Sequence, residues 1–172
     1  DAATVQTEYL THLMTEVHQT NVAELLQRRR YVIVEGPPGT GKTRLARKLL
    51  HENYQNNGVT VQFHPNITYE NFVGGLAPVE TADGLGFRFA PHKGILMHAA
   101  EQAASSLQPY LLHIDEINRA DLAKILGEAI FLFEPDTEDA RQTKLAYDFG
   151  KPFGDSFSLP PNLHIIGTMN SS

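Results

Sequence analysis

Eight consecutive residues of this chain have the types and the order that bind phosphate groups. The segment 36–43 reads Gly-Pro-Pro-Gly-Thr-Gly-Lys-Thr and matches G-x-x-x-x-G-K-[ST] at every fixed position. Backbone N–H groups of such a loop curl around an anion, and the start of a following helix adds its positive dipole end. We predict that the phosphates of a nucleotide contact Gly36, Pro37, Pro38, Gly39, Thr40, Gly41, Lys42, Thr43 and Arg44.

Two side chains of this loop have distinct predicted roles. The Lys42 ammonium group is expected to reach the terminal phosphates, and the Thr43 hydroxyl is expected to bind Mg²⁺. The glycines let the main chain approach the phosphates and adopt backbone angles that are closed to other residues. The segment therefore predicts a nucleoside triphosphate site with a magnesium ion.

Two neighbouring carboxylates, Asp115 and Glu116, follow the apolar run 110–114. Ligands of a parallel sheet collect at the carboxyl ends of its strands. Asp115 is then expected beside Thr43 as a magnesium ligand, mostly through water, because Mg²⁺ takes few protein carboxylates. Glu116 is expected to polarise the attacking water, since phosphoryl transfer needs an in-line nucleophile. The alternative is a pair of acids that begins a surface helix.

A polar residue, Asn170, follows the apolar run 163–168. Its amide can orient water and contact phosphate. After a phosphate loop and an Asp-Glu strand, Asn170 is predicted to join Lys42 and Glu116 in the catalytic set. By itself, an Asn after a strand is a turn residue.

Alternating strand and helix patterns are expected to position these residues. Apolar runs predict strands over 31–34, 59–64, 110–114 and 163–168, and helical spacing predicts helices over 42–53, 94–105 and 121–133. A short helix is expected to begin at Asn21 with Glu24 completing a capping box, after another helical pattern over 10–17. The stretch 65–93 is expected to be irregular with a small hairpin at 86–90, and 144–159 to hold a two-stranded insertion. This order predicts an α/β fold with a mostly parallel sheet covered on both faces.

Composition limits the classes of protein that fit. The 172 residues suit one domain, and 41% hydrophobic residues with no long apolar run argue against a membrane protein. Zero cysteines exclude disulfides and thiolate metal sites, and with no recognisable signal peptide they favour a cytoplasmic location. The formal charge of −6 argues against a general nucleic-acid-binding surface, and His113 is expected to be packed inside its strand rather than to bind metal.

Together, the segments 36–43, 114–120 and 165–170 make the chain resemble AAA+ NTPases. The runs Ile-Asp-Glu-Ile-Asn-Arg-Ala and Ile-Ile-Gly-Thr-Met-Asn are similar to the McrB-type branch, the GTP-driven motors of modification-dependent DNA restriction. The resemblance implies a three-layer P-loop NTPase that is truncated before the family's fifth strand and helical lid. Residues 1–30 are then an N-terminal helical lead-in, and 31–172 a partial AAA+ large α/β subdomain.

The same resemblance implies a substrate, a cofactor and partners. It favours GTP over ATP, with Mg²⁺, in a homo-oligomeric ring that is hexameric in most relatives. A nuclease subunit would be the partner, DNA would be contacted through other domains, and no membrane would be involved. Arg119 is interpreted as a structural ion pair, with action across a subunit interface as the alternative, and 84–93 as a covering hairpin, with a pore-facing loop as the alternative.

Two other functions fit the same motifs. A MoxR-like or dynein-like ATPase that remodels proteins shares the phosphate loop and the Asp-Glu strand. A nucleotide-gated scaffold with little turnover would not require Glu116.

Overall fold

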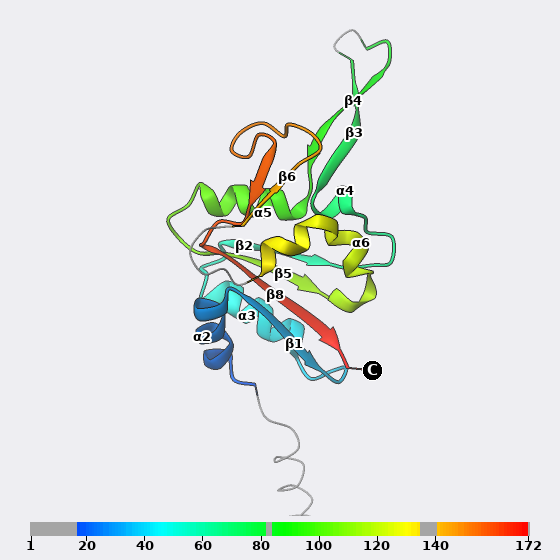
Figure 1. Cartoon of the computed structure of the whole chain (residues 1–172). Helices are drawn as coiled ribbons and strands as arrows, with labels where there is room; N and C mark the ends of the chain where they lie inside the picture. Colours follow the sequence, from blue (N-terminus) through cyan, green and yellow to red (C-terminus); the bar gives the residue numbers. More distant parts are fainter. Residues whose placement is uncertain (1–16, 82–83, 135–140, 172) are drawn as a thin grey trace, which may run out of the picture.

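A four-stranded parallel sheet forms the centre of the chain (Figure 1). The computed structural model describes residues 17–81, 84–134 and 141–171. The strands are β1 (Tyr31–Gly36), β8 (Leu163–Asn170), β5 (Tyr110–Asp115) and β2 (Gly58–Gln62), in that spatial order. Each of the four predicted strands is present, and β1 and β8 continue two residues beyond their predicted ends.

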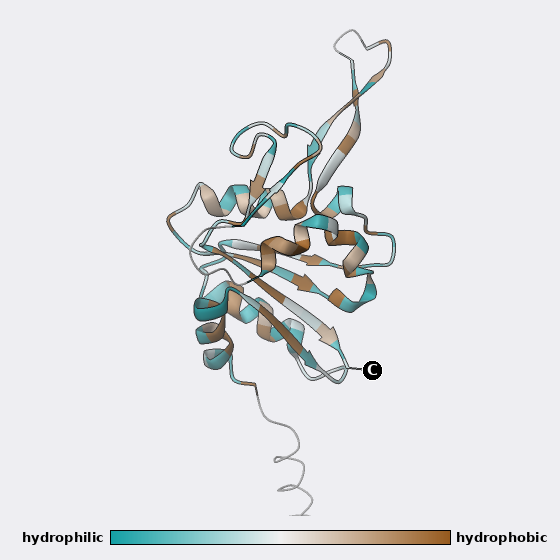
Figure 2. Cartoon of the chain, viewed as in Figure 1, coloured by the Kyte–Doolittle hydropathy of each residue, from teal (hydrophilic) through white to brown (hydrophobic). Residues whose placement is uncertain are grey.

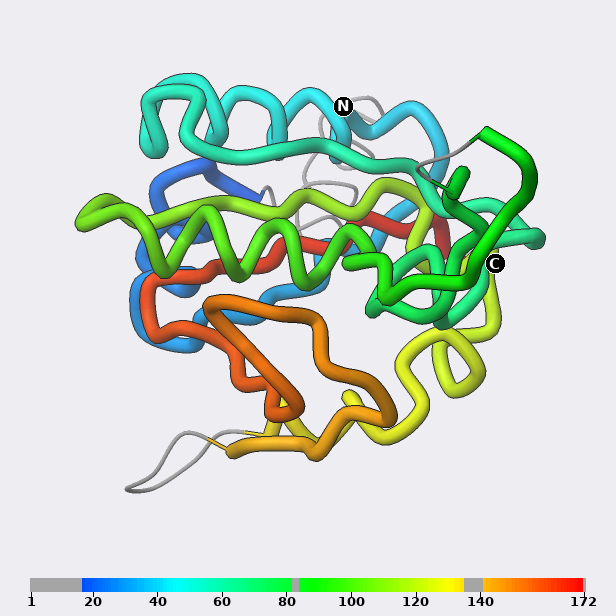
Figure 3. Tube along the Cα trace, turned by 90° about the horizontal axis from the view of Figure 1, so that it is seen from above, coloured from blue at the N-terminus to red at the C-terminus, as the bar shows by residue number. Residues whose placement is uncertain are grey.

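Helices cover both faces of this sheet, which gives the predicted three layers (Figure 3). The helices α2 (Gln19–Arg29) and α3 (Lys42–Glu52) pack on one face, and α5 (Ile95–Ala104) and α6 (Leu122–Leu126) pack on the other. Successive residues of β5 serve opposite layers, since Leu111 packs with α3 and Leu112 with α5. The strands β1 and β5 are accordingly apolar along most of their length (Figure 2). Within the described residues, every helix is too short or too polar to cross a lipid bilayer.

The first described helix differs from its prediction at its start. α2 begins at Gln19 with His18 as N-cap, so the predicted capping box of Asn21 and Glu24 is wrong. Gln19 donates hydrogen bonds from Nε2 to the side chains of Glu52 and Asn53 at the end of α3. Contact between α2 and α3 therefore accompanies the start of α2 two residues before Asn21. The helical pattern predicted at 10–17 lies almost wholly outside the described residues.

The predicted helix over 121–133 is broken in the middle. α6 ends at Leu126, and a 3₁₀ segment, η2 (Gly127–Phe133), follows it. Gly127 has a φ of 48°, and the Tyr69 ring lies 3.3 Å from the point where a Cβ would stand. The contact with Tyr69 and the left-handed backbone interrupt the helix at a residue that tolerates both.

A β-hairpin larger than predicted projects from the sheet (Figure 1). A short helix, α4 (Tyr69–Phe72), leads into β3 (Gly74–Glu80), which pairs antiparallel with β4 (Phe87–Lys93). The expected irregular stretch therefore contains a strand that the sequence did not indicate. Pro78 argues against a strand, but it is tolerated in a two-stranded ribbon. The predicted two-stranded insertion is present as β6 (Gln142–Lys144) and β7 (Ser156–Ser158).

Candidate active site

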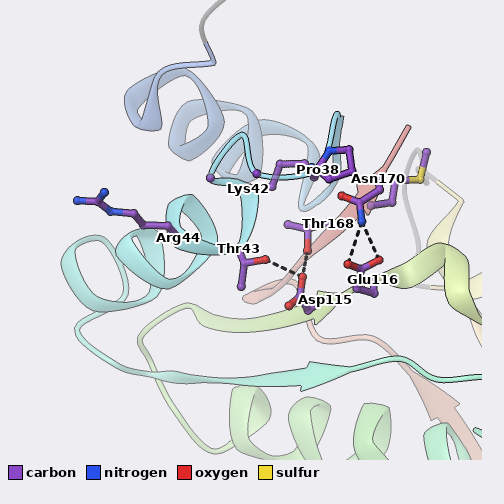
Figure 4. Close-up of a pocket in the computed structure, with 11 residues that line it drawn as sticks. Pro38, Lys42, Thr43, Arg44, Asp115, Glu116, Thr168 and Asn170 are labelled. Atoms are coloured by element: carbon purple, nitrogen blue, oxygen red, sulfur yellow. Dashed lines mark hydrogen bonds between the residues drawn. The ribbon is translucent and has the colours of Figure 1, made fainter. Parts of the chain in front are cut away.

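The predicted site residues meet where β1, β5 and β8 end. Because the three strands are parallel, their carboxyl ends lie at one edge, with Gly36 opposite Asn170 in the register. Most of the predicted residues border a cavity of about 370 Å³ (Figure 4). Its lining residues are Pro38, Gly39, Gly41, Lys42, Thr43, Arg44, Asp115, Glu116, Thr168, Met169 and Asn170.

The phosphate loop has the shape that its glycines predict. Gly39 and Gly41 have φ values of 79° and 85°, which are in the left-handed region. A Cβ would meet no atom within 4 Å at either position, so backbone angle rather than space requires glycine there. Gly41 is the N-cap of α3, and the first N–H groups of that helix have no partner within it. The arrangement can accept an anion at the helix start.

The Lys42 side chain folds back across the loop. Its Nζ donates hydrogen bonds to the carbonyl oxygens of Gly36 at 2.8 Å and Pro37 at 2.7 Å. A third contact joins Nζ to the Thr40 hydroxyl at 3.3 Å. Gly36, Pro37 and Thr40 therefore support the lysine and do not line the cavity. Arg44 borders the cavity, but its side chain extends away from the two carboxylates (Figure 4).

Asp115 accepts two hydroxyl hydrogen bonds on the same oxygen. Thr43 Oγ1 lies 2.9 Å and Thr168 Oγ1 2.6 Å from Asp115 Oδ1. Burial raises the pKa of Asp115, but the hydrogen bonds from Thr168 and Thr43 outweigh it and hold the pKa below its usual value. The carboxylate is therefore ionised at neutral pH. An ionised carboxylate beside a hydroxyl fits Mg²⁺, which prefers oxygen ligands.

Thr168 is a site residue that the sequence analysis missed. It is 1% exposed and contacts both Asp115 and His113. A signal was present, because residues 168 and 170 of one strand point to the same face. Asn170 was identified from its position after the strand, and the same alternation leads back to Thr168.

Glu116 points to the cavity because the chain turns sharply after β5. Neighbouring residues of a strand face opposite sides, yet both acids border one cavity. The left-handed backbone of Glu116, with φ 56° and ψ 45°, breaks the alternation. Asn170 Nδ2 donates to its two carboxylate oxygens at 3.0 and 3.3 Å, and Arg119 Nε lies 3.3 Å from Oε2. Arg119 thus forms an ion pair within the chain.

His113 lies beneath the site and is packed, as predicted. The side chain is fully buried, and burial lowers its pKa to about 4, so the imidazole is neutral at neutral pH. Its Nδ1 lies 3.2 Å from Thr60 Oγ1, and its Nε2 lies 3.2 Å from Thr168 Oγ1. No group of three or more His, Cys, Asp or Glu side chains in the described part of the chain is placed to hold a metal ion.

The sheet order, the phosphate loop and the Asp-Glu strand end define a P-loop NTPase of the AAA+ class. Comparison with known families places it more narrowly. Residues 31–172 match the AAA domain of the dynein-related subfamily, and the chain belongs to that family.

Similar proteins include a restriction-enzyme subunit and a protein of known structure. The type IV methyl-directed restriction enzyme EcoKMcrB subunit of Escherichia coli strain K12 is 34% identical over 164 residues. That match covers 91% of this chain and 34% of the relative, so the chain spans about a third of the relative's length. A crystal structure of a candidate ATPase from Cytophaga hutchinsonii has a TM-score of 0.50 at 16% identity, covering 88% of this chain and 38% of that chain. The second similarity supports the fold alone.

Proposed function

We propose that this domain hydrolyses a nucleoside triphosphate, GTP in preference to ATP, in the cavity at the carboxyl edge of the sheet. The observation that carries the proposal is the convergence of Lys42, Asp115, Glu116 and Asn170 on one cavity beside a glycine loop. A loop alone would support binding, whereas a carboxylate at the cavity wall supports turnover. The preference for GTP rests on the similarity to the McrB subunit.

Each residue has a proposed task in the reaction. The segment 36–44 binds the phosphates through the N–H groups of its non-proline residues, and Lys42 turns from the loop carbonyls to neutralise the terminal phosphates. Thr43 and Asp115 would hold Mg²⁺, which would neutralise charge on the phosphate oxygens when bound. Glu116 accepts the proton of the attacking water while the Asn170 amide orients its carboxylate.

The proposed setting is a cytoplasmic ring of copies of this domain. In that arrangement a neighbouring subunit would complete the site, and other domains would contact DNA. A nuclease subunit would be coupled to the movement along DNA that hydrolysis drives. Residues 1–30 would form a helical lead-in, and 31–172 part of the large α/β subdomain. Similarity to a restriction-enzyme subunit supports this setting.

A second candidate is an ATPase that remodels proteins. The match to the dynein-related subfamily favours it, because that subfamily is named for dynein and not for a restriction enzyme. Selectivity for ATP and an unchanged rate with a nuclease subunit would favour this candidate. Selectivity for GTP with stimulation by a nuclease would favour the first.

The substitution Glu116→Gln in the intact protein that carries this domain tests turnover. It keeps the size of the side chain and removes the proton acceptor. We expect steady-state hydrolysis to fall at least about 100-fold, with nucleotide affinity measured by fluorescence within about threefold of wild type. Glu128→Gln, an exposed residue outside the cavity, is the matched control. An unchanged rate in the Glu116 variant would remove this carboxylate from the mechanism.

A further inference from the structure

A continuous chain of polar side chains crosses the middle of the sheet and ends at Asp115. It begins at Thr60 on β2, passes through His113 on β5 and continues through Thr168 on β8. His113 is fully buried, and Thr168 is 1% exposed. The adjacent positions on the same face of the sheet, Leu111 and Ile166, hold buried apolar side chains. A buried polar group costs free energy unless it is hydrogen-bonded. Each side chain in this hydrogen-bonded series therefore depends on its contacts with the next.

The donors and acceptors in the chain can be ordered from the Asp115 end. An ionised carboxylate only accepts, so the single hydroxyl proton of Thr168 points to Asp115 Oδ1. Their separation of 2.6 Å is typical of a hydroxyl that donates to a carboxylate. Thr168 Oγ1 must then accept from His113 Nε2–H. The imidazole Nδ1 is left to accept the Thr60 hydroxyl proton, which gives the chain one direction.

The two hydroxyls that reach Asp115 come from different parts of the fold. Thr43 lies in the first turn of α3, next to the glycine loop that is proposed to receive phosphate. Thr168 belongs to β8, which is paired on both sides within the sheet. Thr168 therefore orients the Asp115 carboxylate from within the paired sheet. This contact does not depend on any contact that Thr43 makes with a ligand.

We propose that Thr168, held in one orientation by His113, is a positioning residue that fixes the Asp115 carboxylate for magnesium coordination. The inference rests on the proposed function, because it assigns a supporting group to that same site. Removing a residue that is hydrogen-bonded to a metal ligand commonly weakens metal affinity by about 10- to 100-fold. In this role Thr168 acts only through Asp115.

The test is metal binding by the intact protein, with Mn²⁺ as a probe read by electron paramagnetic resonance in the presence of a non-hydrolysable nucleotide. Thr168→Val keeps the shape of the side chain and removes its hydroxyl. We expect this variant to bind Mn²⁺ about 10-fold more weakly, and Thr168→Ser to recover affinity to within about threefold. Nucleotide affinity without metal is expected to change little. Should the Val variant fail to fold, Thr168→Ala removes the hydroxyl and the γ-methyl group without placing an apolar group where the hydroxyl was.

A double-mutant cycle tests whether His113 acts through Thr168. His113→Leu is expected to weaken Mn²⁺ binding less than Thr168→Val, and to add little in the double variant, because the path to Asp115 is already broken. Equal Mn²⁺ affinity in wild type and folded Thr168→Val would overturn the inference and leave Thr168 as a packing residue. A wild-type protein that binds no Mn²⁺–nucleotide would instead contradict the proposed function itself.

Discussion

The two edges of the central sheet use polar side chains in opposite ways. At the carboxyl edge, hydroxyl and amide groups of Thr43, Thr168 and Asn170 are aimed at two carboxylates. At the amino edge, Asn162 Nδ2 contacts three backbone carbonyls at 2.7 to 3.3 Å, and the Arg30 guanidinium contacts two. The hydrogen bonds at the carboxyl edge hold two carboxylates together at the surface. Those at the amino edge satisfy backbone carbonyls of the connecting loops.

Each edge also borders a cavity, and the two cavities have similar volumes. The one at the carboxyl edge has about 370 Å³, and the one at the amino edge about 300 Å³. The second is lined by the uncharged residues Asn53, Tyr54, Gln55, Asn57, Ser106, Gln108 and Pro109. Volume therefore does not distinguish a reactive site here. The distinction comes from charged groups that keep capacity to bind a ligand.

The largest effect should come from removing the cation at the carboxyl edge. Lys42→Met is expected to weaken nucleotide binding at least about 100-fold, because each charge-assisted hydrogen bond to phosphate contributes about 1.5–3 kcal/mol. The free energy of unfolding should change by less than about 1 kcal/mol, since the bonds that Lys42 makes to loop carbonyls are partly exposed. Nucleotide titration and denaturant unfolding measure the two quantities. Lys48→Met, an exposed residue of the same helix, is the control. Equal nucleotide affinity in both variants would contradict the comparison.

The opposite pattern is expected at the amino edge. Asn162→Ala removes the donor to the carbonyls of Ala103, Ser106 and Gln108 and should lower the free energy of unfolding by about 1–3 kcal/mol. Nucleotide affinity and turnover per folded molecule should stay at the wild-type level. Asn57→Ala, which removes contacts to two carbonyls of the same loop, should cost less. A selective loss of turnover in the Asn162 variant would show that the two edges are coupled.

Much of this contrast could be predicted from local sequence. The glycine loop, the four apolar runs and the acids at 115 and 116 each depend on residues close together in the chain. The parallel arrangement then brings their ends to one edge without further information. Local pattern therefore predicted the elements and the edge at which the site lies.

The remaining features depend on neighbours that are distant in the sequence. Thr168 meets His113 and Asp115 only because β8 lies beside β5 in one register. Gly127 interrupts a helix where the ring of Tyr69 packs against it. The strand β3 exists because β4 pairs with it, despite Pro78. In each case a tertiary contact overrides or completes a local preference.

The smallest expected effect is a pH dependence at the amino edge. Burial, and then the charge of Arg30, lower the pKa of His164 below its ordinary value of 6.5. Its Nδ1 lies 2.6 Å from the Tyr54 hydroxyl, and the neutral imidazole can accept that proton. The unfolded chain binds a proton at this histidine more readily than the folded chain does. The contribution of neutral His164 to the free energy of unfolding is therefore complete above pH 6.5 and is lost as pH falls toward the lowered pKa.

Unfolding in denaturant between about pH 7.5 and 5.5 measures this dependence. The free energy of unfolding should decline with falling pH, and His164→Gln should reduce the slope, because glutamine accepts the Tyr54 proton without titrating. His51→Gln is the matched control, since an exposed side chain is hydrated in both the folded and unfolded states. Equal slopes in the wild type and the His164 variant would show that this histidine does not resist protonation. Resistance to protonation would then no longer separate the amino edge from the carboxyl edge.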